Sequence, residues 1–93
     1  MTGHVFHPGH QALHGITVVV ETTEGETYVG RYDTEDQGRI HLLDAGSHRS
    51  ADSQLSKDDY IRKCAKFGVA SQHKHLVIPA AQLTRITPLG DIS

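Results

Sequence analysis

The 93-residue sequence has no tryptophan, only three Tyr and two Phe, and a single cysteine. With 37% hydrophobic residues it can bury one small core, which stabilises a lone subunit by only roughly a few kcal/mol. The lone Cys64 excludes an internal disulfide and is typical of a reducing compartment. We therefore expect one domain over residues 1–93 that works inside a cell and gains stability by assembling with other subunits.

Long apolar runs and an excess of charge are also missing. No run approaches the roughly 18 residues needed to span a bilayer, and residues 1–14 are polar where a secretory signal is apolar, so we expect a soluble, unprocessed protein. Nine Lys and Arg stand against eleven Asp and Glu, for a net charge of −2. No field of the whole surface attracts nucleic acid, and any contact with nucleic acid must be local.

Two β-branched segments joined by a short turn form the clearest pattern. Apolar residues alternate with others from Ile16 to Glu21, as in a strand with one buried face and one partly covered face. Glu24-Gly25 reverses the chain, and Thr27 to Tyr32 predicts a second strand, so the pair indicates a hairpin. Gly30 lacks a side chain in the middle of that strand, which predicts a sharp bend or the close passage of another strand.

Shorter apolar segments predict three further strands. These lie at Ile40–Leu43, Asp59–Lys63 and His75–Pro79, with a mobile loop at Ala45–Lys57, an insertion at Ala65–Lys74, and Ala80–Leu83 as a helical turn or a continuation of the last strand. Residues 1–14 predict an N-terminal cap with a short helical turn from Gly9 to His14.

The number and spacing of the strands favour a small, strongly bent antiparallel barrel over a sandwich, which usually needs about seven strands. The outer strands of such a barrel carry unpaired backbone N–H and C=O groups that can bond to a neighbouring copy. The sequence therefore predicts a mainly β fold that associates through its edges.

Two motifs give the chain a family resemblance. The first combines Gly25-Glu26-Thr27-Tyr28-Val29-Gly30 with the following Glu35-Asp36, and the second combines Tyr60-Ile61-Arg62 with Leu76-Val77-Ile78-Pro79. Over roughly His10 to Leu89 this pattern resembles the Sm and Sm-like RNA-binding family, most closely its Sm D-three type. The resemblance implies an Sm-like, SH3-like fold with a short N-terminal helix followed by five strands of a bent barrel.

The resemblance also implies a heptameric ring, in which strand four of one subunit pairs with strand five of the next around uridine-rich single-stranded RNA. By position, Asp36, Gln37 and Arg39 would belong to the first RNA-binding loop, and Arg62 and Lys63 to the second. Their chemistry suits the role, because Arg offers a planar donor fork and Gln both a donor and an acceptor for a uracil edge. Asp36 is expected to orient the first loop.

The chain departs from the family pattern at both loops. Gly38-Arg39 stands where the family usually has Asn after an apolar residue, and that loop is one residue shorter. Lys63 stands where the family has Gly, and the Ala65–Lys74 insertion follows it. We expect the pore side and its base discrimination to differ accordingly.

Other chemistry in the sequence favours neither a metal site nor catalysis. The close histidines are His4, His7, His10 and His14, and the pair His73 and His75, but Pro8-Gly9 interrupts the first group and no standard set of ligands is complete. Cys64 lacks an orienting group in sequence, and the carboxylates of Asp33, Glu35 and Asp36 are typical of a turn. We expect no enzyme, cofactor or metal.

The aromatic residues are expected to pack. Tyr28 and Tyr32 share one face of the second strand, which favours packing in the barrel or against a neighbour over base stacking. Phe67 is expected to cover an apolar rim or contact a partner.

Three functions remain open. The first is an Sm core subunit of a spliceosomal small nuclear ribonucleoprotein, in a mixed ring that acts in pre-mRNA splicing; it would be nuclear with cytoplasmic assembly. The second is a homo-oligomeric Sm-like RNA-binding protein of prokaryotic or phage type, which would be cytoplasmic. The third is an Sm-like protein adaptor without RNA binding, consistent with the net negative charge.

Overall fold

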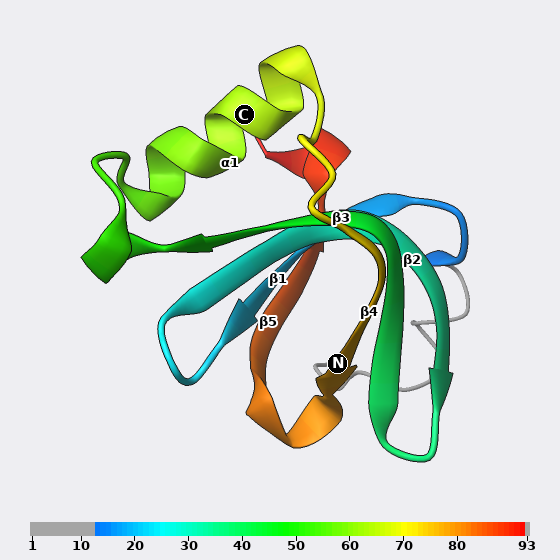
Figure 1. Cartoon of the computed structure of the whole chain (residues 1–93). Coiled ribbons are helices and arrows are strands. Elements are labelled where there is room, and N and C mark those ends of the chain that lie inside the picture. The colour runs from blue at the N-terminus through cyan, green and yellow to red at the C-terminus, as the bar shows by residue number, and fades with distance from the viewer. Residues whose placement is uncertain (1–12, 93) are drawn as a thin grey trace.

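A strongly bent antiparallel sheet with a helix on its outer face makes up the computed structural model, which describes residues 13–92 (Figure 1). The strands are β1 (Thr17–Thr22), β2 (Glu26–Asp36), β3 (Arg39–Arg49), β4 (His73–Pro79) and β5 (Leu83–Pro88), and their order in the sheet is β4-β3-β2-β1-β5. The predicted mainly β fold with five bent antiparallel strands is confirmed. The predicted helical turn at residues 9–14 lies largely outside the described residues.

The bend is concentrated in the long strands β2 and β3. Their register shifts between Val29 and Arg31 and again between Tyr32 and Thr34. A Cβ atom on Gly30 would lie 2.7 Å from the Cβ of Ala45 on β3, so a larger residue would push the two strands apart. The prediction of another strand passing close to Gly30 is confirmed.

Two hydrophobic clusters lie on opposite faces of the sheet. The inner cluster fills the concave side and contains Val18, Val20, Tyr32, Ile40, Leu42, Ala45 and Ile78. The outer cluster contains Val19, Val29, Ile61 and Cys64. Strand β1 contributes to both, because successive side chains of a strand point to opposite faces. We expected the second face of β1 to be only partly covered, but Val19 on that face is 1% exposed and therefore fully buried.

Helix α1 (Lys57–Phe67) covers the outer cluster, and it corrects the predicted strand at Asp59–Lys63. The hydroxyl of Ser56 accepts a hydrogen bond from the Asp59 N–H at 3.1 Å, which caps the first turn. Ile61 and Cys64 are three residues apart and therefore face the sheet together. Gly68 ends the helix, and its N–H donates to the carbonyl of Cys64. None of the helices in residues 13–92 has the length and apolar content needed to cross a membrane.

The later boundaries also differ from those expected. Residues 45–49 continue β3, because they pair with the start of β2, so the predicted Ala45–Lys57 loop is shorter and includes the 3-10 turn η2 (Ser50–Asp52). The predicted Ala65–Lys74 insertion comprises the end of α1, a connector and the start of β4. The 3-10 turn η3 (Ala80–Gln82) confirms the helical turn expected there. Strand β5 follows it, although the sequence pattern did not predict a separate strand at this position, and the 3-10 turn η4 (Leu89–Asp91) comes next.

Replacing Gly30 by Ala should destabilise the protein, because the new methyl group would meet Ala45 at a distance that requires the strands to move. We expect a loss of about 1–3 kcal/mol in the free energy of unfolding, measured by urea titration. Gly90→Ala is the matched control: a Cβ there meets nothing within 4 Å, and it should change stability by less than about 0.5 kcal/mol. Equal stability of the two variants would contradict the role assigned to Gly30.

Candidate nucleic-acid interface

The turn between β2 and β3 brings three of the sequence-predicted residues together. Asp36 ends β2, Arg39 begins β3, and the two residues pair across the hairpin with Gln37 and Gly38 between them. Both central residues have positive φ, 54° at Gln37 and 73° at Gly38, as a type I′ turn requires. Gln is strained in this left-handed region, and strain of this kind occurs often at functional sites.

The second element of the candidate site is η3, which lies against this turn. The Ala80 N–H donates to the Gly38 carbonyl at 2.8 Å, and Arg39 is in register with Pro79 at the end of β4. Figure 1 shows the β2–β3 turn and η3 at the same end of the molecule, away from α1. The small side chains of Ala80 and Ala81 leave the Gln82 amide as the longest polar group of η3.

Hydrogen bonding and charge at the turn favour contact with a base over contact with a phosphate. The Arg39 guanidinium donates to the Gln37 side-chain oxygen at 3.0 Å, so the two groups hold each other in place. The β2 end carries Asp33, Glu35 and Asp36, whose negative charge opposes a phosphate. The exposed Gln37 and Arg39 can still donate to base oxygens, and a carboxylate or amide oxygen can accept from a base N–H.

The structure does not bring Arg62 and Lys63 to this site. Both lie in α1 and not in a loop after a strand, which corrects the position expected from the second motif. Arg62 is exposed and lies 3.9 Å from Asp59 one turn earlier on the helix. Sequence reasoning missed η3 as the partner of the β2–β3 turn, although the apolar segment that ends at Pro79 was recognised.

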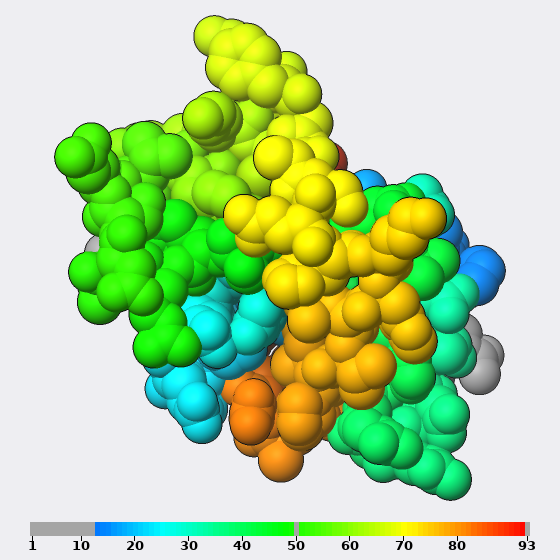
Figure 2. Space-filling view, viewed as in Figure 1, coloured from blue at the N-terminus to red at the C-terminus, as the bar shows by residue number. Residues whose placement is uncertain are grey.

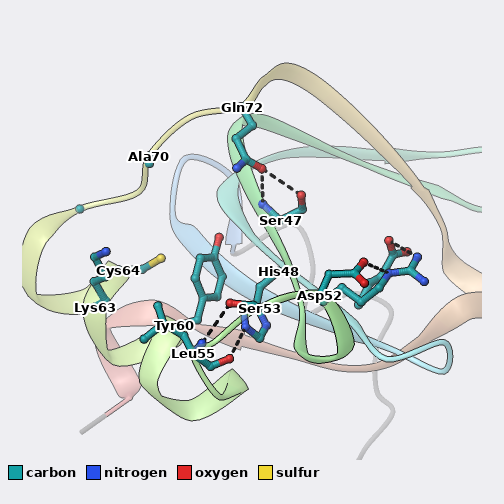
Figure 3. A pocket seen from close by; sticks show the side chains of 13 residues that line it. Ser47, His48, Asp52, Ser53, Leu55, Tyr60, Lys63, Cys64, Ala70 and Gln72 are labelled. Carbon is teal, nitrogen blue, oxygen red and sulfur yellow. Dashed lines mark hydrogen bonds and ion pairs between the residues drawn. The ribbon is translucent and has the colours of Figure 1, made fainter.

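A cavity of about 510 Å³ lies between α1, the connector after it and the end of β3 (Figure 3). Its polar groups largely bond to one another: Ser47 donates to the Gln72 side chain at 3.0 Å, and a ring nitrogen of His48 donates to the Leu55 carbonyl at 2.8 Å. Burial raises the pKa of the Cys64 thiol. Cys64 therefore stays protonated at neutral pH and is not an activated nucleophile.

The histidines that the structure describes form a pair but no larger cluster. His41 and His75, on adjacent strands, have ring nitrogens 2.8 Å apart, and one must donate while the other accepts. Within residues 13–92 no three His, Cys, Asp or Glu side chains converge as a metal site would require. His4, His7 and His10 lie outside the described residues.

The tyrosines pack as expected, whereas of the two roles expected for Phe67 the cover of an apolar rim is not observed and contact with a partner stays a prediction. Tyr32 is 2% exposed in the inner cluster, and burial raises its pKa to about 12. Tyr28 packs against the same cluster and donates from its hydroxyl to Glu26 at 2.8 Å. Phe67 is 73% exposed at the end of α1, so it covers no apolar rim in the described part of the chain.

Comparisons with known proteins show the fold. No family model and no curated protein matches the sequence. The structure resembles the Sm protein of Pyrococcus abyssii in complex with a uridine heptamer, with a TM-score of 0.60, 18% identity, and coverage of 89% of this chain and 99% of that one. It is also similar to a heptameric archaeal Sm protein, with a TM-score of 0.59, 17% identity, and coverage of 88% and 97%.

A further likeness is to a chain in the structure of the NatC complex bound to CoA. The TM-score is 0.56 at 14% identity, over 96% of this chain and 97% of that one. The chain therefore has an Sm-like fold, and its solved neighbours include both RNA-bound and multiprotein structures.

Removing the strain at the turn should stabilise the protein. Gln37→Gly replaces a left-handed non-glycine residue by the residue that accepts this conformation freely, and we expect a gain of about 0.5–1 kcal/mol in urea titrations. Gly38→Ala places a side chain in the same conformation and should lower stability by a similar amount. If Gln37→Gly were neutral or destabilising, the side-chain contact with Arg39 would outweigh the strain.

Proposed function

We propose that this chain is a homo-oligomeric Sm-like RNA-binding protein of prokaryotic or phage type, which holds uridine-rich single-stranded RNA and acts in the cytoplasm. The observation that carries the proposal is the contact between the β2–β3 turn and η3, which places Gln37 and Arg39 beside η3 at one end of the sheet. The archaeal Sm likenesses support this function over that of a spliceosomal subunit.

Assembly into a ring is the second part of the proposal. The sheet is open, with β4 at one edge and β5 at the other, and such edges offer unpaired backbone groups to a neighbour. Val77 on β4 is 39% exposed, and Ile86 on β5 is partly buried. Each edge strand therefore carries an apolar side chain that a neighbouring copy can cover. Pairing β4 of one copy with β5 of the next repeats without leaving an edge only if the chain of copies closes.

A protein adaptor without RNA binding is the second candidate. The carboxylates beside Arg39 weaken the attraction for phosphate, and one fold neighbour belongs to a multiprotein complex. The two functions differ in whether the β2–β3 turn binds RNA.

Native mass spectrometry of the purified chain should show a closed assembly of identical copies. Val77→Lys places a charge on the β4 edge and should shift the mass towards the monomer. Ile16→Lys is the matched control, because Ile16 is 41% exposed but does not lie on an edge strand, and it should leave the assembly intact. A wild-type monomer would rule out the homo-oligomeric ring.

RNA binding should depend on the β2–β3 turn and not on α1. Arg39→Gln should weaken binding of a uridine heptamer by about tenfold or more, measured by fluorescence anisotropy at fixed salt, because a charged donor is lost. Arg62→Ala removes another exposed guanidinium, at the other end of the molecule, and should leave this affinity unchanged. An effect of Arg62→Ala alone would place the site on α1, and no binding by the wild type would favour the adaptor.

A further inference from the structure

Charge is distributed unevenly along the chain. Of the nine Lys and Arg residues, five lie between Tyr60 and Gly90, where there is no Asp or Glu. The other four share the remainder with all eleven acidic residues. The net charge of −2 therefore combines an acidic part with a cationic one, and an asymmetry of this kind is typical of contact with nucleic acid.

The first part of this acid-free stretch, residues 60–82, forms a continuous strip on the surface, whereas Arg85 lies beyond it on β5. It starts in the last two turns of α1, follows the connector of residues 68–72 and continues down β4 to η3. Figure 2 shows these segments, coloured yellow to orange, as an unbroken band across the viewed face. The strip thus joins the outer end of α1 to the element that contacts the β2–β3 turn.

The cations of the strip are exposed and free to bind a partner. Lys63, Lys66 and Lys74 make no ion pair within residues 13–92, and Arg62 has only the distant Asp59. Elsewhere, Arg31, Arg49 and Lys57 are each bonded to a carboxylate at 3.3 Å or less. The strip therefore holds most of the cations that the fold leaves without a carboxylate.

An exposed aromatic ring completes the strip. Phe67 is 73% exposed at the end of α1, and the Lys66 ammonium lies 5.4 Å from its ring centre. Exposed aromatic rings beside cations are the combination with which proteins hold single strands, since bases stack on the ring while phosphates meet the cations. Helix-dipole stabilisation accounts for cations near the end of α1, but it does not account for the exposed Phe67 or for Lys74.

We propose that the part of this strip with Lys63, Lys66, Phe67 and Lys74 is a second binding surface for single-stranded RNA, distinct from the β2–β3 turn and η3. The proposal rests on the proposed function, because it assumes that one part of the RNA is held at the β2–β3 turn. The residues that form the second surface are different ones. The described part of the molecule is 35 Å in its longest dimension, so a uridine trimer held at the turn does not reach Phe67, whereas a strand of about twenty nucleotides does. The strip therefore affects affinity only for long RNA.

The test compares a uridine trimer with a uridine oligonucleotide of about twenty residues, by fluorescence anisotropy across a salt series. The strip variant is Lys63→Gln/Lys66→Gln/Lys74→Gln. Its control, Arg31→Gln/Arg49→Gln/Lys57→Gln, loses the same charge from cations outside the strip. Circular dichroism checks that both variants fold.

For the long probe, the strip variant should bind roughly tenfold more weakly, and its slope of log affinity against log salt should flatten by about 2, because each phosphate contact on a single strand contributes about 0.7. The control should keep the wild-type slope. Phe67→Ala should weaken binding of the long probe by roughly fivefold, and Phe67→Tyr should restore it. None of these changes should alter binding of the trimer.

The outcomes separate the two proposals. If the strip variant and its control bind the long probe with equal affinity, the strip does not bind RNA, and an acidic protein becomes the partner that fits its charge. The turn site stands in that case. If Arg39→Gln does not affect the trimer but the strip variant loses the long probe, the strip stands and the turn site fails. If the wild type binds neither probe, both proposals fail.

Discussion

The close approach of Gly30 to Ala45 is the constraint on which the rest of the fold depends. Because Gly30 has no side chain to meet the Ala45 methyl group, both long strands can bend at this point and curl the sheet. The concave side then encloses the inner cluster, and the convex side remains available to α1. The pairing of β3 with β4, with Arg39 opposite Pro79, brings the β2–β3 turn to η3 at the far end of the bent sheet.

Strand β1 joins the two halves of the structure. Val18 and Val20 belong to the inner cluster and Val19 to the outer one, so a shift of one residue in its pairing would exchange the two sets. Apolar side chains on both faces make such a shift less costly than in a one-sided strand. The bulge between Glu21 and Thr22, where β1 pairs with β5, adds an irregularity that only one alignment satisfies.

The sequence predicts well where local pattern and tertiary environment agree. The first hairpin, the role of Gly30 and the type of fold follow from alternation and turn residues. The prediction of a strand at Asp59–Lys63 was wrong, because this short apolar run fits a strand and a helix equally well. The signals that favour the helix are the Ser56 cap and the three-residue spacing of Ile61 and Cys64. The pairing of the β2–β3 turn with η3 joins residues about 40 positions apart, which no local pattern specifies.

The charge distribution limits how copies of the chain can meet. Neither edge strand contains a carboxylate: β4 carries Lys74 with His73 and His75, and β5 carries Arg85. Attraction between opposite charges on the two edges therefore cannot drive their pairing. Arg85 is in register with Glu21 on β1, and the negative charge of Glu21 offsets the positive charge of Arg85. The repulsion between Arg85 and the Lys74 of an incoming β4 is reduced accordingly. In the proposed ring, the contact between copies would then depend on backbone hydrogen bonds and apolar side chains, while the lysines of α1 would stay available for the proposed RNA.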